Sequence, residues 1–154
     1  MASEIERKFL VTGDGWRDKA TDCLHIVQCY LAQREDVEVR IRVTDGQKAR
    51  LTVKSGNAEK VRSEFEYSIP VPDAREMMRF REGRMIEKRR YIVPREDGRH
   101  WEVDVFEGDL EGLILAEVEF EDGDGSGEID LPGWLGEEVT GDGRYYNSVL
   151  ARTG

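Results

Sequence analysis

Six pairs of like charges two residues apart fall in stretches of this chain that have the pattern of β-strands. The pairs are Glu4/Glu6, Arg40/Arg42, Glu64/Glu66, Lys88/Arg90, Glu102/Asp104 and Glu117/Glu119. Residues i and i+2 of a β-strand face the same way, ~6–7 Å apart. Five of the six pairs enclose an apolar residue, which a strand directs to its opposite face. The pattern therefore predicts strands with one charged face and one apolar face.

Alternation of apolar and polar residues extends this pattern into eight stretches. They are Glu4–Val11, Ile26–Gln33, Val37–Val43, Ala49–Lys54, Arg62–Ile69, Arg84–Val93, His100–Phe106 and Leu113–Phe120. Turn signals such as Asp45-Gly46 and Asp97-Gly98 separate them, and short turns join antiparallel neighbours. The chain is therefore predicted to be mainly β, with eight antiparallel strands.

One helix is predicted between these strands, over residues 72–83. Asp73 and Glu76 have the spacing of a capping box, alanine and methionine residues form an apolar stripe, and Gly83 suits the helix end. A single helix covers little of an eight-stranded sheet. We therefore expect the sheet to close into a barrel with its charges inside and its apolar side chains outside, flanked by a few helices.

Length and charge narrow the class of protein. A chain of 154 residues predicts one domain, spanning residues 1–154. The net charge of −10 argues against binding nucleic acid or a membrane surface through a general basic field. The sequence has no apolar run long enough for a membrane span and only two cysteines, and its acidic amino end is not expected to be a signal peptide. We expect a reduced, cytoplasmic protein, and the sequence leaves a homodimer open.

The charged interior of such a barrel needs compensation. Two like charges ~7 Å apart repel by about 2 kcal/mol at an effective dielectric constant of 20. This repulsion falls if neighbouring strands place acidic side chains beside basic ones, or if ions bind between the like charges. Carboxylates bind Mg²⁺ or Mn²⁺, while arginine and lysine bind phosphate oxygens. The interior therefore suits a polyanion that binds through divalent metals.

Other polar residues give weaker signals. Cys23, His25 and Cys29 do not have the spacing of a structural zinc site. His100 is expected at the surface, at the start of a strand. The segment Glu121–Asp130 is acidic and glycine-rich and is expected to be a surface loop. It is not expected to bind calcium, because it lacks the glutamate that closes a calcium-binding loop.

The ordered set of motifs resembles a known family. Glu4-Ile5-Glu6-Arg7-Lys8 is an ExExK motif, and the other charged pairs, Thr52-Val53-Lys54 and the segment from Thr140 to Asn147 follow in order. Together they resemble the CYTH domain, also called the triphosphate tunnel metalloenzymes, over nearly the whole chain. ExExK alone is a weak signal, whereas the ordered set is specific.

The resemblance implies an eight-stranded antiparallel tunnel that binds a triphosphate and up to two divalent metals, Mg²⁺ or Mn²⁺. The metal ligands that it implies are Glu4, Glu6, Glu64, Glu66, Asp104, Glu117 and Glu119, with Asp104 and Glu102 either binding metal or positioning bases. The phosphate-binding residues that it implies are Lys8, Arg40, Arg42, Lys54, Lys88, Arg90 and Arg144. Lys88, Glu4 and Glu6 are the expected catalytic residues.

The family's activities leave alternatives. The compact chain looks most like the short bacterial inorganic triphosphatases, which implies metal-dependent hydrolysis of tripolyphosphate to pyrophosphate and phosphate. A class IV-type adenylyl cyclase and a thiamine or nucleoside triphosphatase would use the same tunnel. A non-catalytic module that binds polyphosphate or nucleotides is a further alternative.

Overall fold

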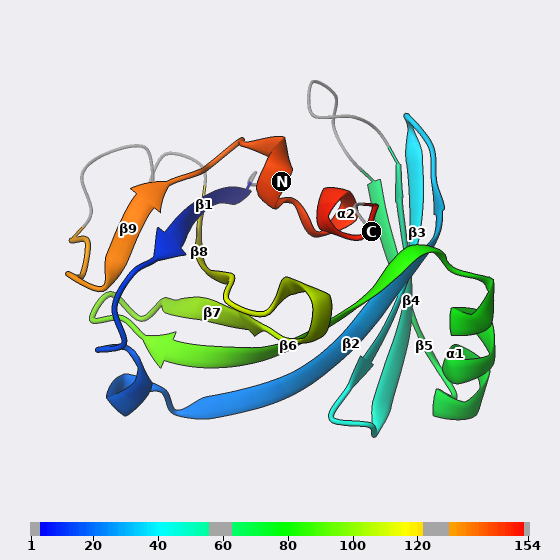
Figure 1. Ribbon diagram of the computed structural model, residues 1–154, viewed down its shortest axis with the longest axis horizontal. Helices are drawn as coiled ribbons and strands as arrows, with labels where there is room; N and C mark the ends of the chain where they lie inside the picture. Colours follow the sequence, from blue (N-terminus) through cyan, green and yellow to red (C-terminus); the bar gives the residue numbers. More distant parts are fainter. Residues whose placement is uncertain (1–3, 56–62, 122–129, 153–154) are drawn as a thin grey trace. The chain divides into compact units, whose positions relative to one another are not determined.

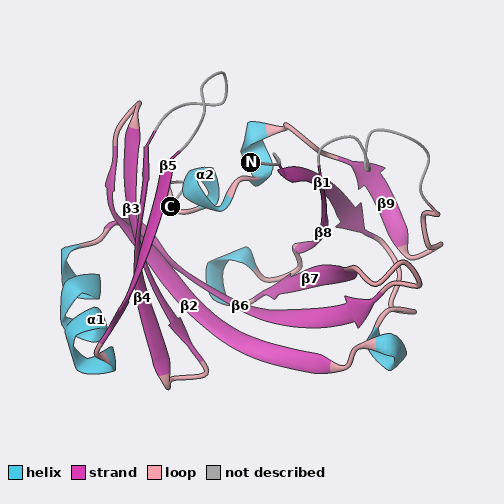
Figure 2. Ribbon diagram, turned by 180° about the vertical axis from the view of Figure 1, so that it is seen from behind, coloured by secondary structure: helices cyan, strands magenta, loops and turns pink. Residues whose placement is uncertain are grey.

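The computed structural model describes residues 4–55, 63–121 and 130–152, except for the side chains of residues 4, 5 and 121. Strands make up most of this part of the chain, and the helices are short (Figure 2). No helix in these ranges is long and apolar enough to cross a membrane. Most of the predicted loop Glu121–Asp130 lies outside the described residues.

The strands form a nine-stranded sheet with the order β5-β4-β3-β2-β6-β7-β8-β1-β9 (Figure 1). Their bounds are β1 Glu4–Val11, β2 Asp22–Gln33, β3 Val37–Thr44, β4 Lys48–Ser55, β5 Ser63–Ile69, β6 Glu82–Pro94, β7 His100–Phe106, β8 Ile114–Glu121 and β9 Leu135–Glu138. The strand pairs whose register is resolved are antiparallel. The mainly β, antiparallel fold is thus confirmed, while closure of the sheet into a tunnel stays a prediction.

The predicted strands are found within two residues of their expected ends, except that β2 begins at Asp22. The ninth strand, β9, was not predicted, because Leu135-Gly136-Glu137-Glu138 has no two-residue alternation. It forms by pairing with β1, where Phe9 lies opposite Glu138. The Asp45-Gly46 turn between β3 and β4 has positive φ angles of 54° and 66°, and the Gln47 N–H donates across it to the Thr44 carbonyl at 3.0 Å.

The chain divides into two compact units. The first contains residues 1–24 and 89–142, and the second contains residues 25–88 and 143–154. β2 and β6 contribute residues to both units. A single domain over 1–154 stays a prediction.

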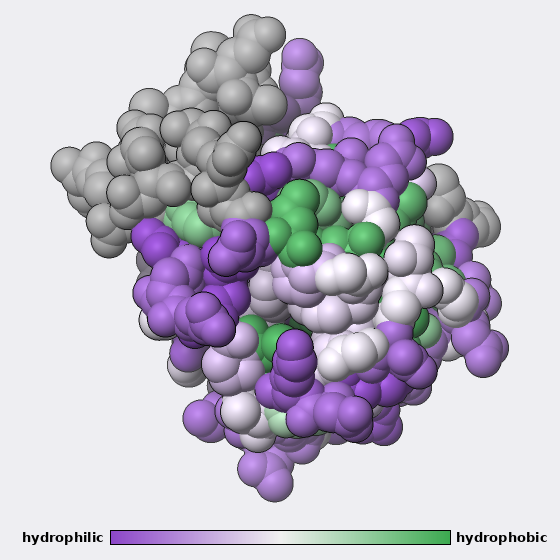
Figure 3. Space-filling view, turned by 90° about the vertical axis from the view of Figure 1, so that its left-hand side faces the viewer, coloured by the Kyte–Doolittle hydropathy of each residue, from purple (hydrophilic) through white to green (hydrophobic). Residues whose placement is uncertain are grey.

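The core of the first unit lies on the apolar faces of β1, β7 and β8. Phe9, Trp101 and Val103 are almost completely buried there. The Trp101 ring contacts the rings of Phe9 and Trp134 edge-on, with centroids 5.7 and 5.6 Å apart. On the face shown in Figure 3, residues of intermediate hydropathy occupy the middle with a few apolar patches, and hydrophilic residues lie around them.

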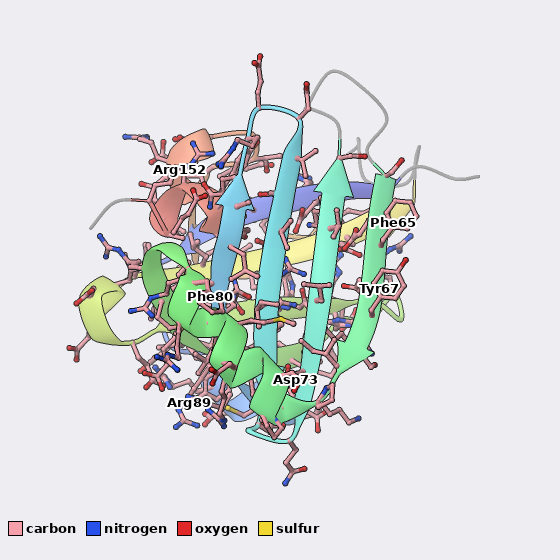
Figure 4. All side chains as sticks on the ribbon, turned by 90° about the vertical axis from the view of Figure 1, so that its right-hand side faces the viewer. Phe65, Tyr67, Asp73, Phe80, Arg89 and Arg152 are labelled. Atoms are coloured by element: carbon pink, nitrogen blue, oxygen red, sulfur yellow. The ribbon has the colours of Figure 1, made fainter. Side chains whose placement is uncertain are left out.

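The core of the second unit lies between the sheet and α1 (Val71–Met77). Ile41 of β3 and Ala74 of α1 are both 0% exposed. α1 packs against β3 and β4. Phe65 and Tyr67 of β5 project outward at the edge of the sheet, and Phe80 lies at the opposite end of this helical segment from Asp73 (Figure 4). The apolar faces of these strands therefore build a second core, as their alternation predicted.

The predicted bounds of this helix were wrong at both ends. α1 begins at Val71 after Pro70, and no side chain caps it. Instead the Pro70 carbonyl accepts a hydrogen bond from the Ala74 N–H at 3.0 Å, which places Asp73 inside the first turn. α1 ends at Met77 and continues as a short 3₁₀ turn, while Gly83 belongs to β6. The predicted capping box of Asp73 and Glu76 therefore does not form.

Ile41→Ala should lower the free energy of unfolding by about 2–5 kcal/mol, because it leaves a cavity in the second unit's core. Phe80→Ala is the matched control, since 70% of Phe80 is exposed, and its cost should stay within about 0.5 kcal/mol. Urea unfolding of both variants measures the difference. Equal costs would contradict this core.

Candidate active site

The register of the first unit places its charges on one face. Lys8 lies opposite Glu117, Glu6 lies opposite Glu119, and Glu117 also lies opposite Glu102 of β7. Residues directly opposite each other share a face of the sheet. Lys8, the glutamates and Asp104 therefore share one side of β1, β7 and β8, which we call the acidic face.

Two basic side chains neutralise part of the negative charge on the acidic face. Lys8 Nζ lies 3.0 Å from Glu117 Oε1. The Arg90 guanidinium donates two hydrogen bonds to Asp104, Nε to Oδ1 at 2.8 Å and Nη2 to Oδ2 at 3.0 Å. Burial acts to lower the pKa of Arg90, but the attraction and the hydrogen bonds of Asp104 outweigh it and raise the pKa. Asp104 is only 3% exposed, so this contact favours its role as the group that positions Arg90.

Glu6 and Glu117 remain crowded. The pKa of Glu6 is raised to about 8, first by a hydrogen bond with the Glu117 carboxyl, then by burial and by repulsion from Glu117. Burial acts to raise the pKa of Glu117, but the hydrogen bond from Glu6 and the charge of Lys8 lower it. Glu6 as a whole residue is exposed, so hydrogen bonding and repulsion by Glu117 matter more for this shift than burial. The raised pKa of Glu6 reflects crowded negative charge, which a bound cation would also relieve.

The acidic face offers hard oxygen donors beside a cavity. Glu102, Glu117 and Glu119 line a cavity of about 630 Å³, together with residues 97–100 and Phe120. Within the described ranges, no three acidic, cysteine or histidine side chains lie close enough together to hold a metal ion. The side chain of Glu4 lies outside the described residues, although its backbone continues β1. The carboxylate pair and its neighbours fit the donor chemistry of Mg²⁺ or Mn²⁺.

The second unit carries most of the predicted phosphate-binding residues. On β2–β5, Gln28 lies opposite Arg42, Arg40 lies opposite Thr52, and Thr52 lies opposite Glu66. We call this shared charged side of β2–β5 the basic face. Glu66 lies 3.3 Å from Arg50 and 3.9 Å from Arg40, so an acid again lies beside bases.

A buried hydrogen-bonded chain links three strands of the second unit to its carboxyl-terminal segment. Lys88 Nζ donates to Asn147 Oδ1 at 2.9 Å, and Gln28 Nε2 donates to the same oxygen at 3.0 Å. Arg42 Nε donates to Gln28 Oε1 at 2.7 Å. Sequence reasoning assigned no role to Gln28 or Asn147. Gln28 stood out as a polar residue in the apolar run of β2 and as part of the family resemblance, and Asn147 only as the last residue of the Thr140–Asn147 segment of that resemblance.

Most of the predicted site residues occupy two faces. The acidic face holds Glu6, Lys8, Asp104, Glu117 and Glu119, with Arg90 bound to Asp104. The basic face holds Arg40, Arg42, Lys54, Glu64 and Glu66, and Lys88 joins it through the hydrogen-bonded chain. Arg144 is exposed, with its guanidinium 5.4 Å from the centre of the Tyr145 ring. That all these side chains line one cavity stays a prediction.

The model of the CYTH domain family matches residues 2–146. The chain belongs to the CYTH family. It is 43% identical to an inorganic triphosphatase of Acetivibrio thermocellus, over 99% of this chain and 95% of that protein. It is 40% identical to an inorganic triphosphatase of Nitrosomonas europaea, over 97% of each chain. A crystal structure of an inorganic triphosphatase matches with a TM-score of 0.79 and 38% identity, over 100% of this chain and 97% of the other.

This CYTH protein should lose stability as pH rises from about 4.5 to about 8 in the presence of a chelator. The folded protein keeps the Glu6 proton in that range, whereas the unfolded chain loses it near its ordinary pKa of 4.5. Allowing for the solvent exposure of Glu6, the loss should be about 1–2 kcal/mol, or a few °C of melting temperature. Thermal scans across this range measure it. Glu6→Gln should flatten the dependence, and an equally steep curve in this variant would assign it to other groups.

Asp104→Asn and Glu6→Gln should change stability in opposite directions at pH 8 with a chelator. Asp104→Asn leaves a buried guanidinium without its carboxylate and should cost about 3 kcal/mol. Glu6→Gln relieves the crowding and should stabilise the metal-free protein. Urea unfolding compares the two variants. If Asp104→Asn were also stabilising, Asp104 would belong with the crowded acids.

Proposed function

We propose that this protein hydrolyses inorganic triphosphate to pyrophosphate and phosphate with the help of a divalent metal ion. The observation that carries the proposal is the acidic face, where the register places Glu6 opposite Glu119 and Lys8 opposite Glu117, and where crowding by Glu117 raises the pKa of Glu6. Family membership and the names of relatives at about 40% identity support the inorganic substrate.

The glutamates of the acidic face would hold the metal. Glu6, Glu117 and Glu119, with Glu4 as predicted, supply carboxylate oxygens, and Glu64 and Glu66 are the further predicted ligands. When bound, Mg²⁺ or Mn²⁺ neutralises phosphate oxygens and acidifies a water ligand. We propose two ions in each active site, in line with the resemblance. Asp104 serves this site by holding Arg90.

The cations would bind and orient the triphosphate. Arg40, Arg42, Lys54, Lys88 and Arg90 are the proposed donors to its oxygens, joined by Lys8 and Arg144. Arginine guanidinium groups form paired hydrogen bonds to phosphate oxygens with defined geometry. The attraction between a buried ammonium and an anion is stronger where water is excluded. Water attacks the terminal phosphorus in line, and the bond to the bridging oxygen breaks. Lys88, which is 0% exposed, is the proposed group that stabilises charge on the leaving oxygen.

The remaining sequence expectations are proposals of the same kind. We propose a single domain over residues 1–154 that acts in the cytoplasm on a small triphosphate. The net charge of −10 supports a protein that binds neither nucleic acid nor a membrane surface.

Phosphate release should require tripolyphosphate together with Mg²⁺ or Mn²⁺, and a chelator should abolish it. Glu119→Gln and Arg42→Ala should each lower kcat/KM at least 100-fold, because they remove a hard ligand and a charge-assisted phosphate contact. Arg79→Ala, at an exposed position beyond α1, is the control and should leave the rate unchanged. The measurement is phosphate release with product analysis.

A substrate panel separates the alternatives. ATP turned over to a cyclic nucleotide would support a cyclase, and preferred cleavage of thiamine triphosphate or ATP would support an organic triphosphatase. Metal-dependent binding of tripolyphosphate without phosphate release would support the binding module. Full activity in a chelator would end the metal-dependent proposal.

A further inference from the structure

The Asn147 side chain is the common acceptor for two buried donors of the second unit. Its Oδ1 accepts hydrogen bonds from Lys88 Nζ at 2.9 Å and from Gln28 Nε2 at 3.0 Å. A carbonyl oxygen has two lone pairs, so these donors use its full accepting capacity. Lys88 and Gln28 are both 0% exposed. The amide oxygen thus fixes two side chains that water does not reach.

The link extends to a third side chain. Gln28 uses its amide nitrogen toward Asn147 and its amide oxygen to accept from Arg42 Nε at 2.7 Å. The amide of Gln28 can therefore bind Arg42 and Asn147 at the same time only in one orientation. Through these two amides, one residue of the carboxyl-terminal segment is connected to two cations on different strands.

The backbone around Asn147 is itself fixed. Asn147 begins α2 (Asn147–Leu150), and the Ala151 carbonyl at its end accepts from the Arg84 N–H at 2.7 Å. The Ser148 carbonyl accepts from Gln33 Nε2 at 2.9 Å. Gly83 of β6 approaches so closely that a Cβ atom there would lie 2.1 Å from the Ala151 oxygen. These contacts hold α2 against β2 and β6 without involving the cations.

We infer that Asn147 is a positioning residue for the phosphate-binding cations Lys88 and Arg42, an inference that rests on the proposed function. A lysine side chain carries a compact charge on a flexible four-carbon stem. A hydrogen-bond acceptor is therefore needed to fix the position of its ammonium group. A neutral amide oxygen supplies that acceptor without cancelling the positive charge. A carboxylate in the same place would hold the ammonium equally well but would offset its attraction for an anion.

The test compares three substitutions by melting temperature and by the Kd for tripolyphosphate with Mn²⁺, with kcat and KM as further readouts. Asn147→Leu removes both accepted hydrogen bonds and should weaken binding at least 10-fold. Asn147→Asp keeps both hydrogen bonds, so it should restore the melting temperature while Kd and KM stay raised at least 10-fold. Gln33→Leu loosens α2 without touching the cations, and should lower the melting temperature with Kd within twofold of the wild type.

Each outcome separates this inference from the proposed function. If Asn147→Asp restores both stability and binding, or if Gln33→Leu weakens binding as much as Asn147→Leu, the role of Asn147 is structural and the inference fails. If the wild type binds tripolyphosphate without cleaving it, the proposed function fails, while the Kd comparison still decides the inference. If the wild type does not bind tripolyphosphate at all, both fail.

Discussion

Repulsion between like charges on the same strand face is the constraint on which the rest of this structure depends. The chain relieves it in three ways. Lys8 and Arg90 lie against carboxylates, Lys88 donates to a neutral amide, and Glu6 keeps a proton beside Glu117. These three solutions leave different amounts of charge available to a ligand. The Glu6–Glu117 pair keeps excess negative charge and the amide leaves the Lys88 ammonium charged, whereas the Arg90–Asp104 pair is largely neutral within itself.

The charged faces exist because the opposite faces supply the stability. Phe9, Trp101 and Val103 build one core and Ile41 builds the other, on the reverse sides of strands that carry acids or bases. A buried ion pair such as Arg90–Asp104 contributes little net stability compared with an apolar replacement, because both groups lose their hydration. Its value is geometric, since two parallel hydrogen bonds fix the plane of the guanidinium.

The sequence predicted correctly those features of the fold that depend on a two-residue period. The strand faces follow from parity alone, which is why Glu6, Lys8, Glu117 and Glu119 share a side as predicted. The period says nothing about which acid pairs with which base, so the Arg90–Asp104 contact and the Glu6–Glu117 crowding required three-dimensional register. β9 and the start of α1 depend on backbone hydrogen bonds rather than on side-chain pattern. Asn147 is far from its partners in the sequence, and a single asparagine carries no periodic signal.

The pairing of the first strand has a consequence for how the chain folds. β1 pairs with β8 and β9, and the ion pair between Arg7 and Glu138 joins residues 131 positions apart. Such distant contacts slow folding, because a long loop must close before its contacts can stabilise the product. During synthesis β1 must therefore wait, unpaired, for most of the chain to emerge. The same alternating charges that line the acidic face keep this waiting strand from pairing with other exposed strand edges, since charged edges resist aggregation.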